Sequence, residues 1–157
     1  MNSFKKDLTG KSSPVKKEII ALMNKALSME YAAYIQYLTH AEMLTGPNCE
    51  SLIARLRELA GDEAKHACTL RDLISNHLLA EPLMNVASTT PAKDLPKILD
   101  INLHDEYEAI DIYETIHEKI VENKSQLKYL HQFLEHAIRH ILMEEEEHVA
   151  ELSLLLS

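Results

Sequence analysis

The sequence predicts an all-α protein, an antiparallel four-helix bundle with one long crossover between helices two and three. Three observations predict this fold class. Glycine and proline are scarce, with 3 and 5 among 157 residues, while helix-favouring residues dominate. Apolar residues recur at helical spacing in four segments of about thirty residues each. Short, long and short connections separate these segments, which is typical of a bundle with one crossover.

The first helix is expected to begin near Pro14, because proline suits the first turn of a helix. The segment TGPN, residues 45–48, ends it. A second helix follows and fades near Ala80. The apolar stripe of the first helix contains Ile19, Met23, Ala26, Ala33, Tyr37 and Leu44, and that of the second contains Leu52, Leu56, Leu59, Leu70 and Leu73.

The segment EPLMNVASTTPAKDLP is expected to be the crossover, because it is too long for a tight turn. Pro96 after Asp94 restarts a helix. The segment ENKSQ is a short turn before the fourth helix. The stripe of the third helix contains Leu99, Leu103, Ile110, Tyr113 and Ile120, and that of the fourth contains Leu134, Ile138, Ile141, Leu152 and Leu155.

Length and composition favour one domain, with a flexible N-terminal tail over residues 1–13 and the bundle over residues 14–157. The net charge of −9 argues against nucleic-acid binding, and the lysines of the tail are expected to be solvated. No apolar run is long enough to span a membrane, and the N-terminus has no signal-peptide core. A cytoplasmic protein is therefore expected. Cys49 and Cys68, roughly 28 Å apart if on one helix, cannot form an intrachain disulfide.

Each of the four apolar stripes is interrupted by ionisable residues. Residues three apart in a helix are separated by roughly 60° around the axis and about 4.5 Å along it, so a Glu-x-x-His pair can face one point. Such pairs interrupt the second and fourth stripes, and single glutamates interrupt the others. The interrupting residues are Glu30, then Glu63 with His66, then Glu106, and finally Glu145 with His148.

A third Glu-x-x-His pair, Glu114 with His117, is set aside by depth in the bundle. Residues at equal depth in an antiparallel hairpin are equidistant from its turn. Glu30 and Glu63 have their midpoint between Gly46 and Pro47, inside the first turn.

In the second hairpin, Glu106 and Glu145 have their midpoint between Ser125 and Gln126, inside the turn. Glu114 paired with Glu145 would centre near Tyr129, in the fourth helix, so Glu114 and His117 are expected to be structural or exposed. Glu108 passes the depth test almost as well as Glu106, and only the apolar stripe separates the two.

Four buried carboxylates without counter-charge would be too costly to keep ionised. Two divalent cations neutralise four carboxylates, and two neutral imidazoles complete the ligand set. Oxygen-rich ligands with two nitrogens and no thiolate favour iron or manganese over structural zinc. The alternative is a polar bundle core in which Glu and His merely pair.

These motifs resemble the ferritin-like di-iron superfamily, and bacterioferritin most closely, over roughly residues 15–155. The segment MEYAAYIQYLTHA resembles the first-helix motif of bacterioferritin, with Glu30, Gln36, Tyr37 and His40. The segments DEAKHA, NLHDEYEA and EEEEHVAEL resemble its second, third and fourth ligand motifs.

The resemblance implies a ferroxidase centre with two iron ions per subunit. There Fe²⁺ would be oxidised by dioxygen or hydrogen peroxide for iron storage, detoxification and protection from oxidative stress. Glu63 and Glu145 would bridge the metal ions, and Glu30, Glu106, His66 and His148 would be terminal ligands. Tyr37 would lie beside the site, able to donate a hydrogen bond or an electron.

Some features of bacterioferritin are not expected here. Alanine occupies position 64, where that family has its haem-ligating methionine, so no haem is expected. Nine residues after His148 are too few for its fifth helix, which leaves a twelve-subunit particle or a dimer open. The alternative functions are a rubrerythrin-like di-iron peroxidase and a non-enzymatic, metal-stabilised bundle. Rubrerythrins have a second helix-three glutamate where this chain has Ala109, and an iron domain with Cys-x-x-Cys motifs.

The sequence also predicts a homo-oligomer. It would be at least a dimer, and a closed shell is the favoured assembly. The first two helices carry apolar residues beside their main stripes, and a second subunit would cover them. These residues are Leu22, Met29 and Tyr34 on the first helix, and Ile53, Ala60, Ala67 and Ile74 on the second.

Overall fold

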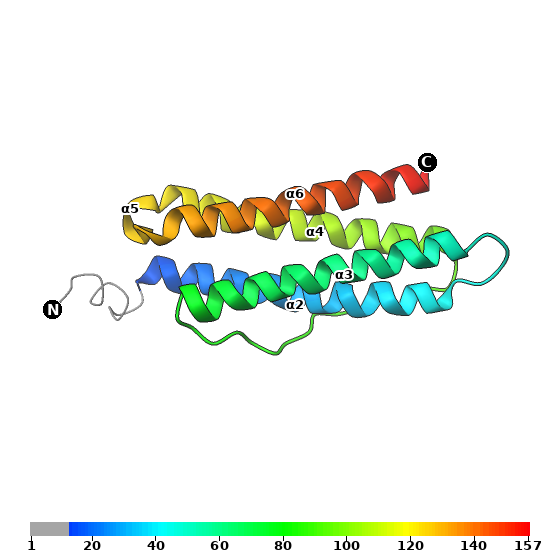
Figure 1. Ribbon diagram of the computed structural model, residues 1–157, viewed down its shortest axis with the longest axis horizontal. Helices are drawn as coiled ribbons and strands as arrows, with labels where there is room; N and C mark the ends of the chain where they lie inside the picture. The colour runs from blue at the N-terminus through cyan, green and yellow to red at the C-terminus, as the bar shows by residue number, and fades with distance from the viewer. Residues whose placement is uncertain (1–12) are drawn as a thin grey trace.

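The computed structural model describes residues 13–157, which contain five α-helices, one π-helical turn and no strand. The predicted tail lies outside these residues, except for Ser13. Two antiparallel pairs lie side by side in an elongated bundle (Figure 1), as the sequence predicted. The first pair is α2 (Pro14–Met43) with α3 (Glu50–Asp72), and the second is α4 (Leu95–Glu122) with α6 (Leu130–Leu156).

The helix boundaries follow from local chemistry. The Ser13 hydroxyl accepts a hydrogen bond from the amide of Lys16 at 3.2 Å and caps α2. The Asp94 carboxylate does the same for α4, accepting from the amide of Lys97 at 3.3 Å. After α2 the chain turns at Gly46, whose φ of 116° suits only glycine.

Two details differ from the prediction. The π-helical turn η1 (Leu73–His77) extends α3, and the short α5 (Lys124–Leu127) occupies much of the predicted turn ENKSQ. Tyr129 precedes α6 instead of lying inside the fourth helix. Helix ends vary by one or two residues with local packing, which a periodic pattern cannot resolve.

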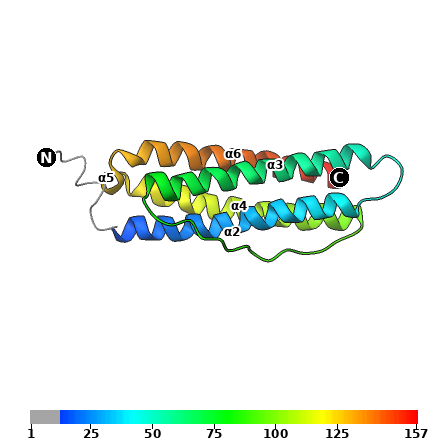
Figure 2. The same cartoon turned by 60° about the horizontal axis from the view of Figure 1, so that its bottom comes forward.

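The crossover, residues 78–94, runs in extended form along α2 (Figure 2). Asn24 of α2 accepts a hydrogen bond from the amide of Leu83 at 2.8 Å. One turn further, the carbonyl of Ser28 accepts from the amide of Ala87 at 2.9 Å. The crossover is therefore attached to α2 at defined points. None of the helices within residues 13–157 contains an apolar stretch of the length that a membrane span needs.

The buried apolar residues form two clusters along the bundle axis. One contains Ile19, Leu70, Ile116 and Ile138, and lies toward α5. The other contains Ala41, Leu56, Ile98 and Leu152, and lies toward the opposite end. Each long helix contributes to both clusters, and between the two contributions it presents the ionisable residues predicted from its stripe. A buried polar layer thus separates two apolar cores.

The surplus apolar surface is smaller than the sequence suggested. Ala60, Ala67 and Ile74 are buried within the chain itself, so no second subunit is needed to cover them. Tyr34 is exposed, while Leu22 and Met29 are half-buried and pack against the core. The buried face of a helix in this bundle is wider than one stripe, because two neighbouring helices contact it.

Candidate metal centre

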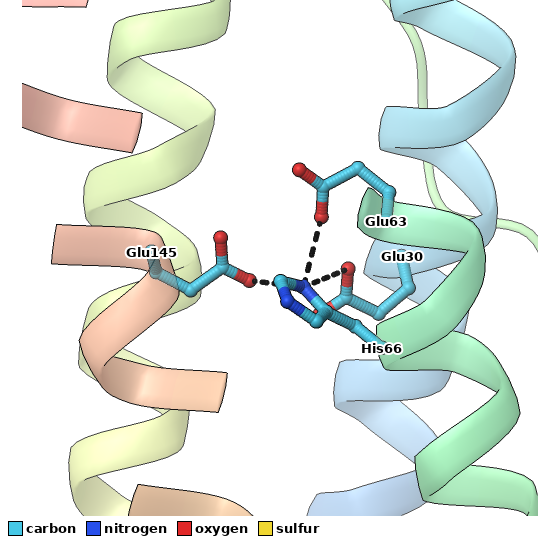
Figure 3. A group of neighbouring side chains, drawn as sticks. All are labelled: Glu30, Glu63, His66 and Glu145. Atoms are coloured by element: carbon cyan, nitrogen blue, oxygen red, sulfur yellow. Dashed lines mark hydrogen bonds and ion pairs between the residues drawn. The ribbon is translucent and has the colours of Figure 1, made fainter. Parts of the chain in front are cut away.

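Six ionisable side chains from four helices meet in the polar layer at the middle of the bundle. All six are at most 4% exposed. Their ligand atoms form two overlapping groups, within each of which the atoms lie within 4.8 Å of one another. The first group, drawn in Figure 3, is Glu30, Glu63, His66 and Glu145, and the second is Glu63, Glu106, Glu145 and His148.

Both imidazoles turn Nδ1 toward the carboxylates. Nδ1 of His66 lies 3.3 Å from Glu63, 3.1 Å from Glu145 and 3.7 Å from Glu30. Figure 3 shows these three carboxylates converging on the His66 ring from α3, α6 and α2.

The second half of the centre repeats this arrangement. Nδ1 of His148 lies 3.2 Å from Glu63, 3.1 Å from Glu145 and 3.7 Å from Glu106. The two ring centroids are 6.0 Å apart. Glu63 and Glu145 are thus shared by two equivalent half-sites.

The other nitrogen of each imidazole faces an acidic residue on the opposite helix. Nε2 of His66 lies 2.7 Å from Glu144 of α6. Nε2 of His148 lies 3.7 Å from Asp62 of α3. Each of these acids directly precedes a shared glutamate in sequence. A carboxylate at Nε2 fixes the ring so that Nδ1 is free to bind a metal ion.

Two buried tyrosines complete the symmetry of the centre. The Tyr37 hydroxyl of α2 donates a hydrogen bond to Glu106 of α4. The Tyr113 hydroxyl of α4 donates one to Glu30 of α2. The sequence analysis placed Tyr37 here but counted Tyr113 only as apolar core. One signal could have identified it, since each tyrosine follows the glutamate of its own helix by seven residues, two helical turns.

Burial and mutual contact perturb the titration of the cluster. Burial raises the pKa of Glu106 to about 7, although the nearby His148 opposes the shift. Burial and then the neighbouring carboxylates, Glu145 first, raise the pKa of Glu63. Burial also raises the pKa of Tyr37, and nearby Glu106 adds to the shift, so its hydroxyl keeps the proton it donates.

At the other members of the cluster, neighbouring groups of opposite charge have a larger effect on the pKa than burial has. Burial alone would lower the pKa of His148, but the nearby carboxylates of Glu106, Glu145 and Glu63 outweigh it and raise the pKa to about 12. Burial alone would raise the pKa of Glu145, but close contact with His148 and His66 outweighs it and lowers the pKa to about 2. Protons on the imidazoles therefore supply the positive charge that metal ions would otherwise bring.

The donor set fits two divalent cations. Oε1 of Glu63 and Oε1 of Glu145 are buried without a hydrogen-bond partner in the described part of the chain. Each lies near an imidazole Nδ1, but outside hydrogen-bonding geometry. A buried carboxylate oxygen without a partner is costly, and these two belong to the glutamates that both groups share. Four carboxylates and two imidazoles suit iron or manganese.

The remaining sequence candidates lie elsewhere. Glu114 is exposed, and Nε2 of His117 lies 3.0 Å from Glu135. Glu108 is exposed and lies 3.5 Å from His104, while Glu106 is buried among the six. Ala64, at the position of the family's haem methionine, is exposed on α3.

Comparisons with known proteins agree with this fold. The sequence model of the ferritin family, described as a ferritin-like domain, matches residues 20–157. A structure of ferritin-like, diiron-carboxylate proteins from Bacillus anthracis str. Ames is 26% identical, with a TM-score of 0.84, covering 92% of this chain and 99% of that one. None of the curated proteins matches the sequence.

A second structure is bacterioferritin from Rhodobacter capsulatus, described with a metal-free dinuclear site and haem iron. It is 19% identical, with a TM-score of 0.79, and the match covers 89% of this chain and 84% of that one. At this identity the likeness shows the fold alone.

Proposed function

The chain belongs to the ferritin-like family, and from that premise we propose that it is a ferroxidase, oxidising Fe²⁺ to Fe³⁺ at its six-residue centre. The observation that carries the proposal is the sharing of Glu63 and Glu145 between two half-sites. Each shared glutamate has one buried oxygen without a hydrogen bond in the described residues. These oxygens are the atoms that two adjacent cations would satisfy.

In this proposal Glu63 and Glu145 would contribute to both ion sites. Glu30 and His66 would hold one ion, and Glu106 and His148 would hold the other, as the two groups of neighbouring ligand atoms suggest. Each Fe²⁺ gives up one electron, so a pair supplies the two electrons that, with two protons from water, convert dioxygen to hydrogen peroxide or one hydrogen peroxide to two water molecules. Manganese could occupy the same ligands.

The neighbouring residues orient the ligands and hold protons. Glu144 and Asp62 orient the imidazoles through Nε2. The hydroxyl of Tyr37 holds Glu106 in place, and its phenol is near enough to act as an electron donor. The two apolar cores shield the layer from water on both sides along the bundle axis, which strengthens charge interactions within it.

We also propose that the protein forms a homo-oligomer that stores or detoxifies the oxidised iron and protects against oxidative stress. The supporting feature is exposed apolar side chains on α2 and the crossover. These are Tyr34, Ile35, Leu83, Met84 and Val86, of which Met84 is 91% exposed. Light scattering on the purified protein tests assembly, and a monomer at micromolar concentration, with or without iron, would exclude the storage role.

The decisive experiment is anaerobic addition of Fe²⁺ to the metal-free protein, followed by dioxygen or hydrogen peroxide. A ferroxidase binds two Fe²⁺ per chain and forms Fe³⁺ faster than the same iron in buffer, over repeated additions. A bundle that uses metal only for stability binds the ions but shows no repeated oxidation. Comparing the two oxidants distinguishes a ferroxidase that uses dioxygen from a peroxidase.

A further inference from the structure

A cavity of about 70 Å³ lies beside the metal centre, between α2, α4 and the crossover. That volume holds several water molecules. Its inner wall includes the ligand candidates Glu30, Glu63 and Glu106. Its outer wall includes Ser88 of the crossover and Glu108 of α4, both of which are exposed. The cavity therefore connects the buried carboxylates with the surface.

Small side chains keep this cavity open. Positions in its wall that could carry larger residues carry alanine or serine instead, on all three segments that surround it. They are Ala32 and Ala33 of α2, Ala87 and Ser88 of the crossover, and Ala109 of α4.

The crossover is attached to α2 on both sides of the cavity. On one side are the hydrogen bonds from the crossover to Asn24 and Ser28. On the other side, Gln36 accepts from the amide of Thr90 at 2.7 Å, and Nε2 of His40 donates to its carbonyl at 2.9 Å. These four α2 positions follow one row of residues spaced four apart, and Ala32 is the position between the two pairs.

A buried amide supports the second attachment. Asn102 of α4 donates to Nδ1 of His40 at 2.9 Å and accepts from Gln36 at 3.1 Å. Both backbone polar groups of Thr90 are thereby held by a network that is itself satisfied. The crossover is thus held in a fixed position where it covers the cavity.

The mouth of the cavity is acidic. Asp105 and Glu108 line it, and with His104 they form a cluster whose ligand atoms lie within 4.8 Å of one another. Such clusters are common on protein surfaces and do not by themselves make a site. Here the same cavity is also lined by Glu63, which is 1% exposed and whose Oε1 has no hydrogen-bond partner among the described residues. Negative charge at the mouth is followed by an unsatisfied carboxylate at the inner end.

We propose that this cavity is the passage through which divalent cations reach the metal centre, and that Asp105 and Glu108 capture them at its mouth. The inference rests on the proposed function, because it gives that centre its supply of Fe²⁺. A cleft lined by charges of one sign raises the local concentration and association rate of an opposite charge.

The test uses Co²⁺, whose visible absorption reports binding without any oxidation. The Asp105→Asn/Glu108→Gln double variant removes the charge at the mouth. Asp105 accepts a hydrogen bond from Gln36 at 2.6 Å, which Asn can still accept. We expect two Co²⁺ per chain as in wild type, with association about tenfold slower at low ionic strength and less dependent on salt. Glu114→Gln, an equally exposed acid of α4 outside the cavity, is the matched control and should bind at the wild-type rate.

Ser88→Trp tests the passage independently of charge. A large ring at the mouth should slow both uptake and removal of Co²⁺ by a chelator by the same factor, leaving the equilibrium affinity unchanged. Wild-type rates in both variants would overturn the passage while leaving the ferroxidase proposal standing. Failure of the wild-type protein to bind Co²⁺ at all would instead overturn the metal centre, and the passage with it.

Discussion

Nε2 of His66 on α3 lies 2.7 Å from the carboxylate of Glu144 on α6. This contact joins the two helical hairpins of the bundle through the outer edge of a ligand candidate. It leaves Nδ1 of the same ring among Glu30, Glu63 and Glu145. Glu144 therefore determines which nitrogen of His66 is presented to a metal ion.

Loss of the Glu144 charge should weaken metal binding. In Glu144→Gln the side chain keeps its size but no longer favours a proton on Nε2 of His66. We expect Co²⁺ affinity to fall about tenfold, the lower end of the range for such partners, because Glu144 is partly exposed. Competition with a chelator of known affinity measures the change. Glu147→Gln, an exposed neighbour on α6, is the control and should bind as wild type does.

Glu63→Ala should separate stability from function. The substitution removes a shared ligand, so the two-ion centre and rapid Fe²⁺ oxidation should be lost. The metal-free variant should nevertheless fold, because it no longer buries a carboxylate oxygen without a partner. Thermal melting of the metal-free variant measures its folding, and melting with added Co²⁺ measures whether the two-ion centre is lost. Saturating metal should stabilise wild type by roughly 3 kcal/mol at a hundredfold excess over Kd, and the variant far less.

The control for this prediction is Glu114→Ala, which alters the other Glu-x-x-His pair. Glu114 is exposed on α4, so metal stoichiometry, oxidation rate and melting temperature should stay at wild-type values. Oxidation at the wild-type rate in Glu63→Ala, or a comparable loss in Glu114→Ala, would show that the wrong pair was chosen.

Much of the fold follows from the sequence because each helix must bury one stripe. Apolar spacing located the long helices, and Pro14, Gly46 and Asp94 marked their ends. The six residues of the centre were also predictable, since an ionisable residue inside an apolar stripe has to face the interior. Equal depth from the turns then placed them opposite one another.

The remaining features depend on contacts between hairpins, which periodicity along one helix does not reveal. No pattern along α3 or α6 distinguishes Asp62 and Glu144 from other acidic residues, yet each faces an imidazole on the opposite helix. Tyr113 read as apolar core, although its hydroxyl meets Glu30. The path of the crossover depends on single polar residues of α2, such as Asn24, that interrupt no pattern.

The two tyrosines should have equivalent structural effects. In Tyr113→Phe, Glu30 loses its buried hydrogen bond, and in Tyr37→Phe, Glu106 loses its own. We expect each variant to lose about 1–3 kcal/mol of unfolding free energy in the metal-free state. Denaturant titration measures this loss. If either variant kept the wild-type stability, its buried carboxylate would have to accept a hydrogen bond from another group.

The purified protein should lack haem. Ala64 cannot supply a thioether ligand at the position where the resemblance places the haem methionine. Expression with added haem precursor, followed by a visible spectrum, should show no haem absorption band. A spectrum typical of haem held by two methionines would show that another methionine of the chain acts as the haem ligand.

Metal-free protein should lose stability as pH rises from neutral, and the pKa shifts fix the direction. The pKa of His148 is raised from 6.5 to about 12, so its contribution to stability is complete below pH 6.5 and is lost as pH rises through the folded value. The pKa of Glu106, raised from 4.5 to about 7, acts in the same direction over a lower range. The pKa of Glu145 is lowered from 4.5 to about 2, so its contribution is lost as pH falls below 4.5.

The free energy of unfolding of the metal-free protein should therefore be greatest near pH 4.5 and fall from there toward pH 9, by roughly 1.4 kcal/mol per pH unit for each retained proton. The melting temperature should follow the same course. His148→Gln should flatten the alkaline limb. Added Co²⁺ should restore stability most strongly at high pH, because a metal ion binds the deprotonated imidazole and displaces its proton. Stability of the metal-free protein that rose between pH 6.5 and 9 would contradict the protonated histidines, and with them the view that metal ions replace imidazole protons at this centre.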